Sequence, residues 1–411
     1  MLTVTIQMRG HLDWDIQDAQ QELNELVRSC QCQIAAEMTC KVQKPNPTFL
    51  IGRGKIEEIA RITEEGKIDV AIFNQQLSPA QQRNIEEVVG IKTIDRSQLI
   101  LDIFAQRAQS REGKLQVELA QLQYLLQRLT GQGILLSRLG GGIGTRGPGE
   151  QKLEMDRRRI RDRIGCLERE LKEVEARRAA SQQKRERNAV PTVVLIGYTN
   201  AGKSTLMNQL TQAGVLAKDQ MFSTLDPVAR RLILPNHQSV VLVDTVGFIH
   251  DLPHHLISAF NATLEGVRRA DILLHVLDIN HTRAREHYEA VYGVLEQIGS
   301  SEKEMITLLN KSDLIANPDQ ISRFQKEFER GIPISAKTGK GVDLLLQFLA
   351  HQLSEQLVLL KILIPASEMR LVSKVYEEGQ VFYREDRPEG VWLEARVPVR
   401  LANQIKVFAS E

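Results

Sequence analysis

The most constraining feature of this chain is the segment GYTNAGKS at residues 197–204, which follows an apolar run at residues 193–196. A buried strand that leads through a glycine-rich loop into a helix is the arrangement that binds nucleoside triphosphates. Backbone N–H groups of the loop and the positive end of the helix surround the phosphate oxygens. Lys203 is predicted to neutralise phosphate charge and Ser204 to ligate Mg²⁺. The predicted nucleotide-binding residues of this phosphate loop are Gly197, Tyr198, Thr199, Asn200, Ala201, Gly202, Lys203 and Ser204.

A second buried run, at residues 240–243, ends at Asp244 and is followed by Thr245, Val246 and Gly247. An acidic residue at the end of such a strand lies beside the metal, and the glycine amide lies beside the terminal phosphate. We therefore predict that Asp244 holds a metal-bound water and that the amide of Gly247 senses the γ-phosphate.

Two later segments predict which base is bound. Asn310, Lys311, Ser312 and Asp313 follow the apolar run at residues 305–309. A carboxylate there accepts two hydrogen bonds from guanine, whereas adenine offers an acceptor at N1 and nothing at C2. Because adenine would leave a buried carboxylate unpaired, the segment predicts selection of guanine by Asn310 and Asp313. The turn predicted to support the guanine edge consists of Ser335, Ala336 and Lys337.

A polar segment between the first two motifs carries one threonine that could reach both Mg²⁺ and the γ-phosphate. GTPases keep this part of the chain ordered through the γ-phosphate and release it on hydrolysis. Thr224 is therefore predicted to ligate Mg²⁺ together with Ser204. The segment spans residues 222–227, and its predicted nucleotide-binding residues are Phe222, Ser223, Thr224, Leu225 and Asp226. The predicted catalytic residues are Lys203, Thr224, Asp244 and Gly247.

Two further residues refine the catalytic prediction. Phe248 stands where Ras-like enzymes carry the glutamine that orients the attacking water. An aromatic ring has no donor or acceptor for that task, so hydrolysis is expected to be slow without a partner. Asn200 has two interpretations: it helps to hold a monovalent cation, such as K⁺, in place of an arginine finger, or it is tolerated for its turn geometry.

With two longer stretches, these motifs make the chain resemble the HflX family of ribosome-associated GTPases. The stretches are REGKLQVELAQL at residues 111–122 and GGGIGTRGPGE at residues 140–150, which leads to DRRRI at residues 156–160. The resemblance covers about residues 50–350. It implies a cytoplasmic GTPase that uses GTP and GDP, binds the large ribosomal subunit and its RNA, and splits or rescues stalled ribosomes.

The length of 411 residues exceeds what one hydrophobic core holds, so several domains are expected. We expect a small α/β domain at residues 1–108 and a helical hairpin arm at residues 109–188. A P-loop GTPase domain with a mostly parallel, doubly wound sheet is expected at residues 189–352, and a small α+β domain at residues 353–411. We expect the chain to act as a monomer.

The arm is predicted from two apolar seams with alternating spacings of four and three residues. The seams are Leu115, Leu119, Leu122, Leu126 and Leu129, and Ile160, Ile164, Leu167, Leu171 and Val174. Two such helices most simply form an antiparallel hairpin. Residues 131–150 contain eight glycines and are interpreted either as a disordered linker or as a tip that enters an RNA-lined site. A dinucleotide fingerprint at Gly142, Gly144 and Gly147 is rejected because no strand precedes it.

Charge is unevenly distributed, although the formal net charge of the whole chain is only +1. Five arginines crowd one part of the arm and are interpreted either as a solvated helix face or as contacts to a phosphate backbone. They are Arg157, Arg158, Arg159, Arg161 and Arg163.

The flanking domains carry weaker signals. In the first, strands are expected near Ile34 and at residues 68–73 and 91–94, between helices at residues 14–27, 55–63 and 78–89. Residues 52–55 (GRGK) are interpreted as a turn into a helix, with an anion site as the alternative. In the last domain, strands are expected at residues 358–364, 381–383 and 391–395, the last two joined by a hairpin turn at residues 388–390.

The sequence also bears on the cellular compartment and on alternative functions. No apolar N-terminal segment with a basic flank and no bilayer-length apolar run is present, so a cytoplasmic protein without a membrane span is expected. The four cysteines are interpreted as reduced thiols, with a metal site at Cys30, Cys32 and Cys40 as the alternative. The rival functions are an ATP-using kinase or ATPase, and an RNA-binding scaffold with a vestigial nucleotide site.

Overall fold

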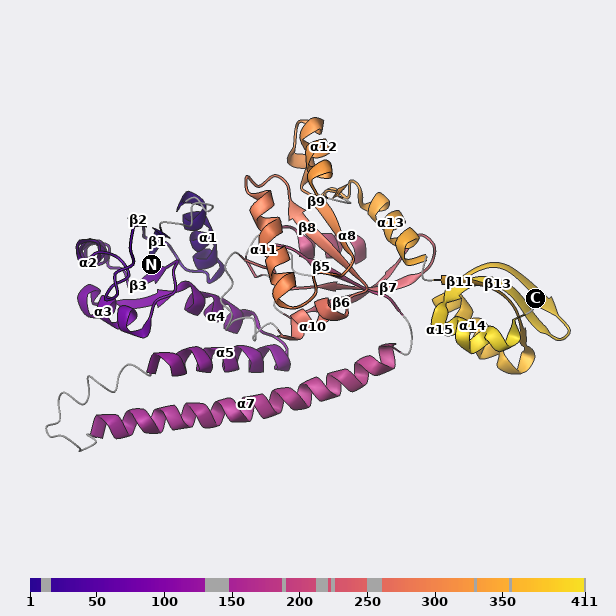
Figure 1. Ribbon diagram of the computed structural model, residues 1–411, viewed down its shortest axis with the longest axis horizontal. Helices are drawn as coiled ribbons and strands as arrows, with labels where there is room; N and C mark the ends of the chain where they lie inside the picture. Colours follow the sequence, from indigo (N-terminus) through magenta and orange to yellow (C-terminus); the bar gives the residue numbers. More distant parts are fainter. Residues whose placement is uncertain are drawn as a thin grey trace. The chain divides into compact units, whose positions relative to one another are not determined.

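The computed structural model describes residues 1–8, 16–129, 148–186, 190–211, 221–222, 226–249, 261–328, 331–354 and 357–409 (Figure 1). Of the glycine-rich tip predicted at residues 131–150, residues 131–147 lie outside the described residues, as do Ser223, Thr224 and Leu225. The chain divides into two compact units. The first comprises Met1–Val174, Lys218–Asp226 and Leu252–Ala262, and the second comprises Glu175–Ala217, Pro227–Asp251 and Thr263–Glu411.

The first unit contains a parallel four-stranded sheet in the order β2-β1-β3-β4. Its strands are β1 (Leu2–Met8), β2 (Ala36–Val42), β3 (Val70–Phe73) and β4 (Lys92–Asp95), and its helices are α1 (Ile16–Ser29), α2 (Arg53–Glu65), α3 (Pro79–Val89) and α4 (Arg96–Arg107). Alternating strands and helices favour a parallel sheet because each helix crosses back over it. The predicted α/β domain is confirmed, although β1 and α4 were not predicted.

The alternating sequence of β1 is typical of a strand with one face in water, although no strand was predicted there. Both faces are in fact buried, since Thr3 is completely covered. The Thr3 hydroxyl donates to Asn24 Oδ1 at 3.0 Å and accepts from Gln20 Nε2 at 2.8 Å. Polar residues of α1 therefore cover the polar face of the strand and hydrogen-bond to Thr3, whereas the buried Thr5 hydroxyl has no hydrogen-bond partner among the described residues.

The arm consists of α5 (Arg111–Leu129) and α7 (Pro148–Glu186). Leu115, Leu167 and Leu171 form a buried cluster, against which Leu119, Leu122 and Val174 pack. Arg163 pairs with Glu118 at 2.8 Å and Arg111 pairs with Glu170 at 3.6 Å. In these two pairs the residue number is lower in α5 where it is higher in α7. The two helices are therefore antiparallel, as Figure 1 also shows. The predicted hairpin is confirmed.

The second unit contains a six-stranded sheet in the order β10-β9-β8-β5-β7-β6. The strands are β5 (Thr192–Ile196), β6 (Val228–Ile233), β7 (Ser239–Asp244), β8 (Ile272–Asp278), β9 (Met305–Asn310) and β10 (Ile332–Pro333). Neighbouring strands are parallel except for β6 and β7. The helices include α8 (Lys203–Thr211), α10 (Asn261–Arg269), α11 (Ala284–Gln297), α12 (Pro318–Glu327) and α13 (Val342–Ser354). The predicted mostly parallel sheet is confirmed.

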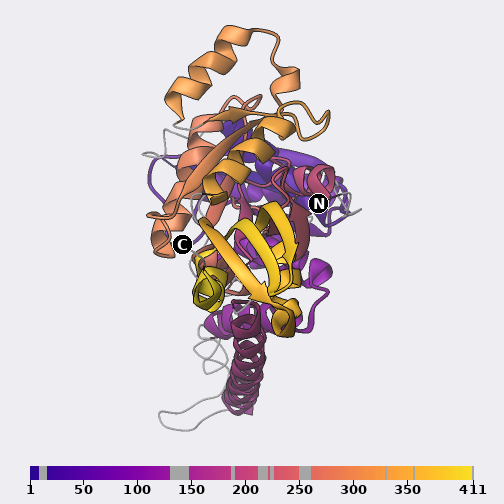
Figure 2. The same cartoon turned by 90° about the vertical axis from the view of Figure 1, so that its right-hand side faces the viewer.

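A three-stranded antiparallel sheet, in the order β11-β13-β12, follows α13. It consists of β11 (Leu357–Pro365), β12 (Gln380–Arg387) and β13 (Gly390–Pro398), with α14 (Met369–Glu378) and α15 (Val399–Ile405). Ile362, Leu393, Val375 and Ile405 share one buried core, so the helices cover one face of the sheet (Figure 2). The predicted α+β domain is confirmed. Within the described ranges, no helix has both the length and the apolar character needed to cross a membrane.

Candidate active site

The predicted nucleotide motifs meet at one edge of the six-stranded sheet. The phosphate loop leaves the central strand β5 and enters α8, while β7 ends at Asp244 and β9 ends at Asn310. Leu195 lies opposite Asp244 in the register of β5 and β7. Because these strands are parallel, their carboxyl ends lie together, which is where ligands of open α/β sheets bind.

Two glycines of the phosphate loop occupy positions that exclude a side chain. Gly197 has a φ of +152°, and a β-carbon there would lie 2.4 Å from the carbonyl oxygen of Val276. Gly202 has a φ of +100°, and its β-carbon would lie 2.3 Å from Asn310 Nδ2. The loop can therefore pack this closely on β8 and on the end of β9 only with glycine.

Lys203 is buried at the start of α8 and points back into the loop. Its ammonium group donates to the carbonyl oxygens of Gly197 at 3.1 Å and Tyr198 at 2.8 Å. Burial lowers the pKa of Lys203 to about 8, and the nearby charge of Asp244 opposes that shift. A desolvated cation whose hydrogen bonds within the described part of the chain go to neutral carbonyls suits a site for an anionic phosphate.

Ser204 and Asp244 lie in direct contact. The Ser204 hydroxyl donates to Asp244 Oδ2 at 2.7 Å, and Asp244 is completely buried. A hydroxyl and a carboxylate are the hard oxygen donors that Mg²⁺ prefers, so the pair fits the predicted metal. Thr224, the other predicted metal ligand, lies outside the described residues.

The segment after Asp244 runs along the phosphate loop. Thr199 N donates to Phe248 O at 2.8 Å, and Phe248 N donates to Gly197 O at 3.0 Å. A β-carbon on Gly247 would lie 2.8 Å from Thr199 Cα and 3.1 Å from Lys203 Nζ, so only glycine fits there. The side chain of Phe248 is buried.

Three other residues of the predicted nucleotide site, Thr245, Val246 and Asn200, have local structural roles. The Thr245 hydroxyl donates to Leu195 O at 2.6 Å and so joins the end of β7 to β5, while Val246 is buried. Asn200 adopts a φ of +61°, the left-handed conformation that asparagine tolerates better than most residues. This agrees with the turn interpretation of Asn200, and the cation interpretation stays a prediction.

Asn310 joins the phosphate loop to the predicted guanine turn. Its Nδ2 donates to Ala201 O at 2.7 Å, and its Oδ1 accepts from Ala336 N at 2.9 Å. In the same region, the Ser312 amide and hydroxyl both donate to Ile334 O, at 3.1 and 2.8 Å. The side-chain amide of Asn310 thus holds two rims of the site together.

The remaining guanine-site residues lie around this junction. Lys311 pairs with Asp278 at 2.6 Å, so the Lys311 side chain is fixed over the end of β8. Asp313 is exposed and so is Lys337, whereas Ser335 is completely buried. Asp313 therefore presents a carboxylate that a base can reach, beside a turn whose backbone is already held.

Of the polar segment between the first two motifs, Phe222 and Asp226 are described. Both are bonded within the first unit: Phe222 packs its ring on Phe104, and Asp226 accepts hydrogen bonds from Gln109 and Ser110. The prediction that these two residues contribute to nucleotide binding is not tested by these contacts.

Sequence reasoning missed a group of rings beside the phosphate loop. Tyr198 stacks on His287 with ring centroids 3.8 Å apart, and His281 lies 4.4 Å from His287. His275 in β8 is buried, and neither ring nitrogen has a hydrogen-bond partner among the described residues. Burial, followed by the charge of Lys203, lowers the pKa of His275 to about 3. The histidine inside the apolar run at residues 272–277 was the signal that could have revealed it.

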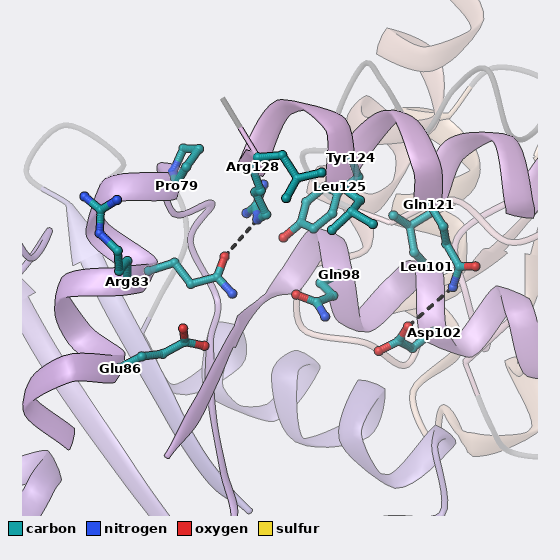
Figure 3. A pocket seen from close by; sticks show the side chains of 12 residues that line it. Pro79, Arg83, Glu86, Gln98, Leu101, Asp102, Gln121, Tyr124, Leu125 and Arg128 are labelled. Atoms are coloured by element: carbon teal, nitrogen blue, oxygen red, sulfur yellow. Dashed lines mark hydrogen bonds between the residues drawn. The ribbon is translucent and has the colours of Figure 1, made fainter. Parts of the chain in front are cut away.

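A cavity of about 370 Å³ lies in the first unit, among α3, α4 and α5 (Figure 3). At its edge, Arg128 pairs with the completely buried Asp95 at 2.6 Å and lies 3.6 Å over the ring of Tyr124. Arg128 also donates to Gln82 Oε1 at 2.8 Å, and Gln121 donates to Asp102 at 3.5 Å (Figure 3). These contacts hold α5 against α3 and α4.

Most arginines of the arm cluster have carboxylate neighbours. Arg157 and Arg161 lie 3.7 and 3.8 Å from Glu154, and Arg159 lies 3.8 Å from Asp156. The pairs of Arg159 and Arg161 are exposed and therefore weak, which supports the interpretation of a solvated helix face, whereas the Arg157 side chain is only 18% exposed. Arg53 and Lys55 likewise pair with Glu57 and Glu58 along α2, which supports the turn into a helix.

The cysteine cluster has no metal-site geometry in the part of the chain that the structure describes, where no group of three or more His, Cys, Asp and Glu side chains could hold an ion. Burial raises the pKa of Cys30 to about 11, with a further contribution from Cys32. The Cys30 thiol is therefore protonated at neutral pH.

The chain is similar to known GTP-binding proteins along most of its length. Family models match residues 17–105 (GTP-binding GTPase N-terminal), 107–185 (GTP-binding GTPase middle region), 192–311 (50S ribosome-binding GTPase) and 321–406 (HflX C-terminal domain). A relative from Lacrimispora saccharolytica, named GTPase HflX, is 45% identical over 94% of this chain and 91% of its own length. The relative of the same name from Escherichia coli is 43% identical over 94% of this chain and 91% of its own length. A solved complex of SsGBP with GDP is 28% identical, covers 86% of this chain and 99% of that chain, and has a TM-score of 0.49.

Proposed function

Because the chain belongs to the HflX family of GTPases, we propose that it binds the large ribosomal subunit and couples GTP turnover to splitting or rescue of stalled ribosomes. The chain is a GTP hydrolase, which removes the ATP-using enzyme and the vestigial site as alternatives. The observation that supports the ribosomal role is the match of a 50S ribosome-binding GTPase model to residues 192–311, the segment whose motifs meet at the sheet edge. We further propose that the protein acts as a cytoplasmic monomer.

The phosphate site is proposed to work by exchange of partners. Lys203 would transfer its hydrogen bonds from the carbonyls of Gly197 and Tyr198 to phosphate oxygens, and the amide of Gly247 would face the γ-phosphate. Ser204 and Thr224 would ligate Mg²⁺, with Asp244 holding a water on it. The bound Mg²⁺ would neutralise the charge that develops on the phosphates.

Base recognition is proposed to depend on the exposed carboxylate of Asp313. Guanine presents two donors to such a carboxylate, at N1 and at the 2-amino group. Asn310, whose amide group is bonded to Ala201 and Ala336, would contribute by holding the turn at residues 335–337 against the phosphate loop. A correct base and a correctly formed phosphate loop would therefore depend on each other.

Hydrolysis is proposed to be slow in the free protein and faster on the ribosome. Phe248 is buried and bonds to the phosphate loop only through its backbone, so it offers no group that orients a water. A K⁺ ion held by Asn200 is the second candidate for the missing stabilisation, with the ribosome itself as the first. The exposed Arg158 and the glycine-rich segment are proposed to contact ribosomal RNA.

The proposed function assigns a role to two of the four domains that we propose for the chain. We propose the domains at residues 1–108, 109–188, 189–352 and 353–411. The second of these, the arm, would contact RNA, and the third would respond to the nucleotide.

Sedimentation with purified large subunits tests the proposal. With a non-hydrolysable GTP analogue, most of the protein should pellet with the subunits, whereas with GDP or without nucleotide most should stay in solution. Lys203→Ala is the control, because it removes the cation of the phosphate site and should abolish the dependence on nucleotide. GTP turnover should rise by about tenfold or more when subunits are added. Equal pelleting in all three states, or turnover that does not change, would contradict a nucleotide-controlled ribosomal role.

A further inference from the structure

We propose that His287 of α11 is a positioning residue: its ring holds Tyr198, and through Tyr198 the phosphate loop, in the conformation that receives the nucleotide phosphates. The inference rests on the proposed role of the phosphate loop and goes beyond it, because α11 carries no nucleotide motif. The three rings involved, those of Tyr198, His281 and His287, all belong to the second unit.

The contact between Tyr198 and His287 is a stack of two buried rings. Their centroids lie 3.8 Å apart and their planes differ by 7°, and only 4% of Tyr198 and 7% of His287 is exposed. Tyr198 is the second residue of the phosphate loop, and His287 lies in the first turn of α11. Rotation of the tyrosine about its Cα–Cβ bond would break this contact, so the stack fixes the direction in which the ring points.

The backbone of Tyr198 is part of the phosphate site itself. Its carbonyl oxygen accepts from Lys203 Nζ at 2.8 Å and from Ala201 N at 3.3 Å. Gly197 and Gly202 adopt positive φ and have no side chain that could anchor the loop. The loop therefore depends on its other residues for rigidity, and a carbonyl that Lys203 contacts belongs to the residue whose ring is stacked.

The ring of His287 also has a second ring as a neighbour. The centroid of His281 lies 4.4 Å away, with the planes tilted by 38°. His281 lies in the turn between β8 and α11, where its Nδ1 accepts from Arg283 N at 3.1 Å. In the same turn, Ile279 N donates to Asn310 O at 3.2 Å. The stacked rings therefore join the phosphate loop to a turn that is bonded to the end of β9.

The stack should affect the binding of both nucleotides. GTP and GDP both place phosphates in the loop that contains Tyr198. With the stack intact, the loop is ordered before the nucleotide arrives. Without it, binding has to fix Tyr198 and its neighbours, which costs conformational entropy. Loss of the stack should therefore weaken GTP and GDP alike, mainly through faster dissociation.

Three substitutions on α11 test the role of the ring. His287→Ala removes the stack, whereas His287→Phe keeps a flat aromatic face beside Tyr198. Val291→Ala is the matched control, because Val291 is completely buried one turn further along the same helix. It removes apolar volume from α11 without changing any of the three rings, so it separates a general loss of stability from a loss of positioning.

The measurement is the affinity of the full-length protein for fluorescent GDP and for a fluorescent non-hydrolysable GTP analogue, both with Mg²⁺. His287→Ala should bind both about fivefold more weakly, with faster dissociation, whereas His287→Phe should stay within about twofold of the wild type. Val291→Ala should bind both like the wild type, although its melting temperature is lower. An unchanged affinity in His287→Ala, an equal loss in Val291→Ala, or no recovery in His287→Phe would overturn the proposal.

A double-mutant cycle tests whether the effect passes through Tyr198. Tyr198→Ala and His287→Ala remove the same stack from its two sides, so the double variant should lose no more than about twofold beyond the weaker-binding single variant. Losses that multiply would show two independent effects and contradict the proposal. If His287→Ala prevents folding, His287→Leu fills the space without a flat ring and should weaken both nucleotides about threefold. Wild-type affinity in His287→Leu would equally contradict the proposal.

Lys203→Ala separates this proposal from the phosphate site on which it rests. We expect losses in both Lys203→Ala and His287→Ala, with the larger loss in Lys203→Ala. If Lys203→Ala weakens both nucleotides and His287→Ala weakens neither, the phosphate site stands and the positioning role is wrong. If Lys203→Ala leaves both affinities unchanged, the proposed phosphate site fails, and the positioning proposal fails with it.

Discussion

Two buried carboxylates, Asp95 in the first unit and Asp244 in the second, have opposite kinds of partners. Asp95 accepts hydrogen bonds from the amides of Leu77 and Gln98 and from the Tyr124 hydroxyl, and it pairs with the charged Arg128. Asp244 accepts from the neutral hydroxyl of Ser204, and the nearby cation Lys203 donates to neutral carbonyls. Asp95 thus makes a direct ion pair, whereas the hydrogen bonds of Asp244 with Ser204 and of Lys203 with two carbonyls each join a charged group to a neutral one. We infer that the first is built for stability and the second for exchange.

The contrast between the two carboxylates predicts the largest effect for a substitution of Asp95, on the stability of the first unit. Asp95→Ala leaves Arg128 buried without its carboxylate, which should lower the free energy of unfolding of the first unit by about 3–5 kcal/mol. Chemical denaturation measures the loss, and hydrogen exchange of peptides from residues 1–129 assigns the transition to this unit. Asp69→Ala, an exposed position before β3, is the control and should change the free energy by less than about 0.5 kcal/mol. A loss at Asp95 no larger than at Asp69 would remove the contrast.

A second prediction concerns exchange at the base. Asp313→Asn replaces an acceptor by a donor where guanine presents donors, so GTP affinity should fall by about a hundredfold. Xanthosine triphosphate, which has an oxygen at C2, should become the better ligand. Competition binding of the two nucleotides measures the ratio, with Asp319→Asn, exposed in α12, as the control. An unchanged preference for GTP would show that Asp313 does not recognise the base.

The third prediction concerns acid stability of the second unit. The folded protein keeps His275 neutral, because burial lowers its pKa to about 3 from an ordinary value near 6.5. Above pH 6.5 both folded and unfolded states are neutral there, so His275 has no effect on stability. Below pH 6.5 the unfolded chain gains a proton that the folded chain does not, which lowers stability by up to about 1.4 kcal/mol per pH unit down to pH 3.

His275→Leu checks this sign, since it removes the titrating group from β8. Unfolding free energies of both proteins should be compared between pH 7 and 5, the range in which the wild type loses about 2 kcal/mol through this group. The variant should lose less stability on acidification than the wild type. Identical acid dependence in both would mean that His275 is not held neutral.

The edge of the nucleotide site could be predicted because it follows from local sequence. Apolar runs that end at residues 196, 243 and 309 form parallel strands, and parallel strands place such ends together. The two-sided burial of β1 could not be predicted, since it depends on Gln20 and Asn24 of a helix that comes later in the chain.

Contacts between distant parts of the chain were equally beyond prediction. Asn310 reaches Ala201 across 109 residues, and Asp226 reaches Ser110 across 116. The partner of an asparagine or an aspartate cannot be predicted from the residue type. Its local conformational preferences are the same whether the partner is a base, a metal or a remote amide. The roles of such residues depend on tertiary structure, which periodicity and motif spacing do not encode.

The side-chain amide of Asn310 connects the phosphate loop to the turn that is proposed to support the base. It touches the phosphate loop with its nitrogen and the turn after β10 with its oxygen, within 2.7 and 2.9 Å. We therefore expect a structural change at either end to alter the other. A nucleotide with the wrong base should then also be bound less tightly at its phosphates. We therefore infer that a substitution at Asn310 would weaken selection of the base and affinity for the phosphates together.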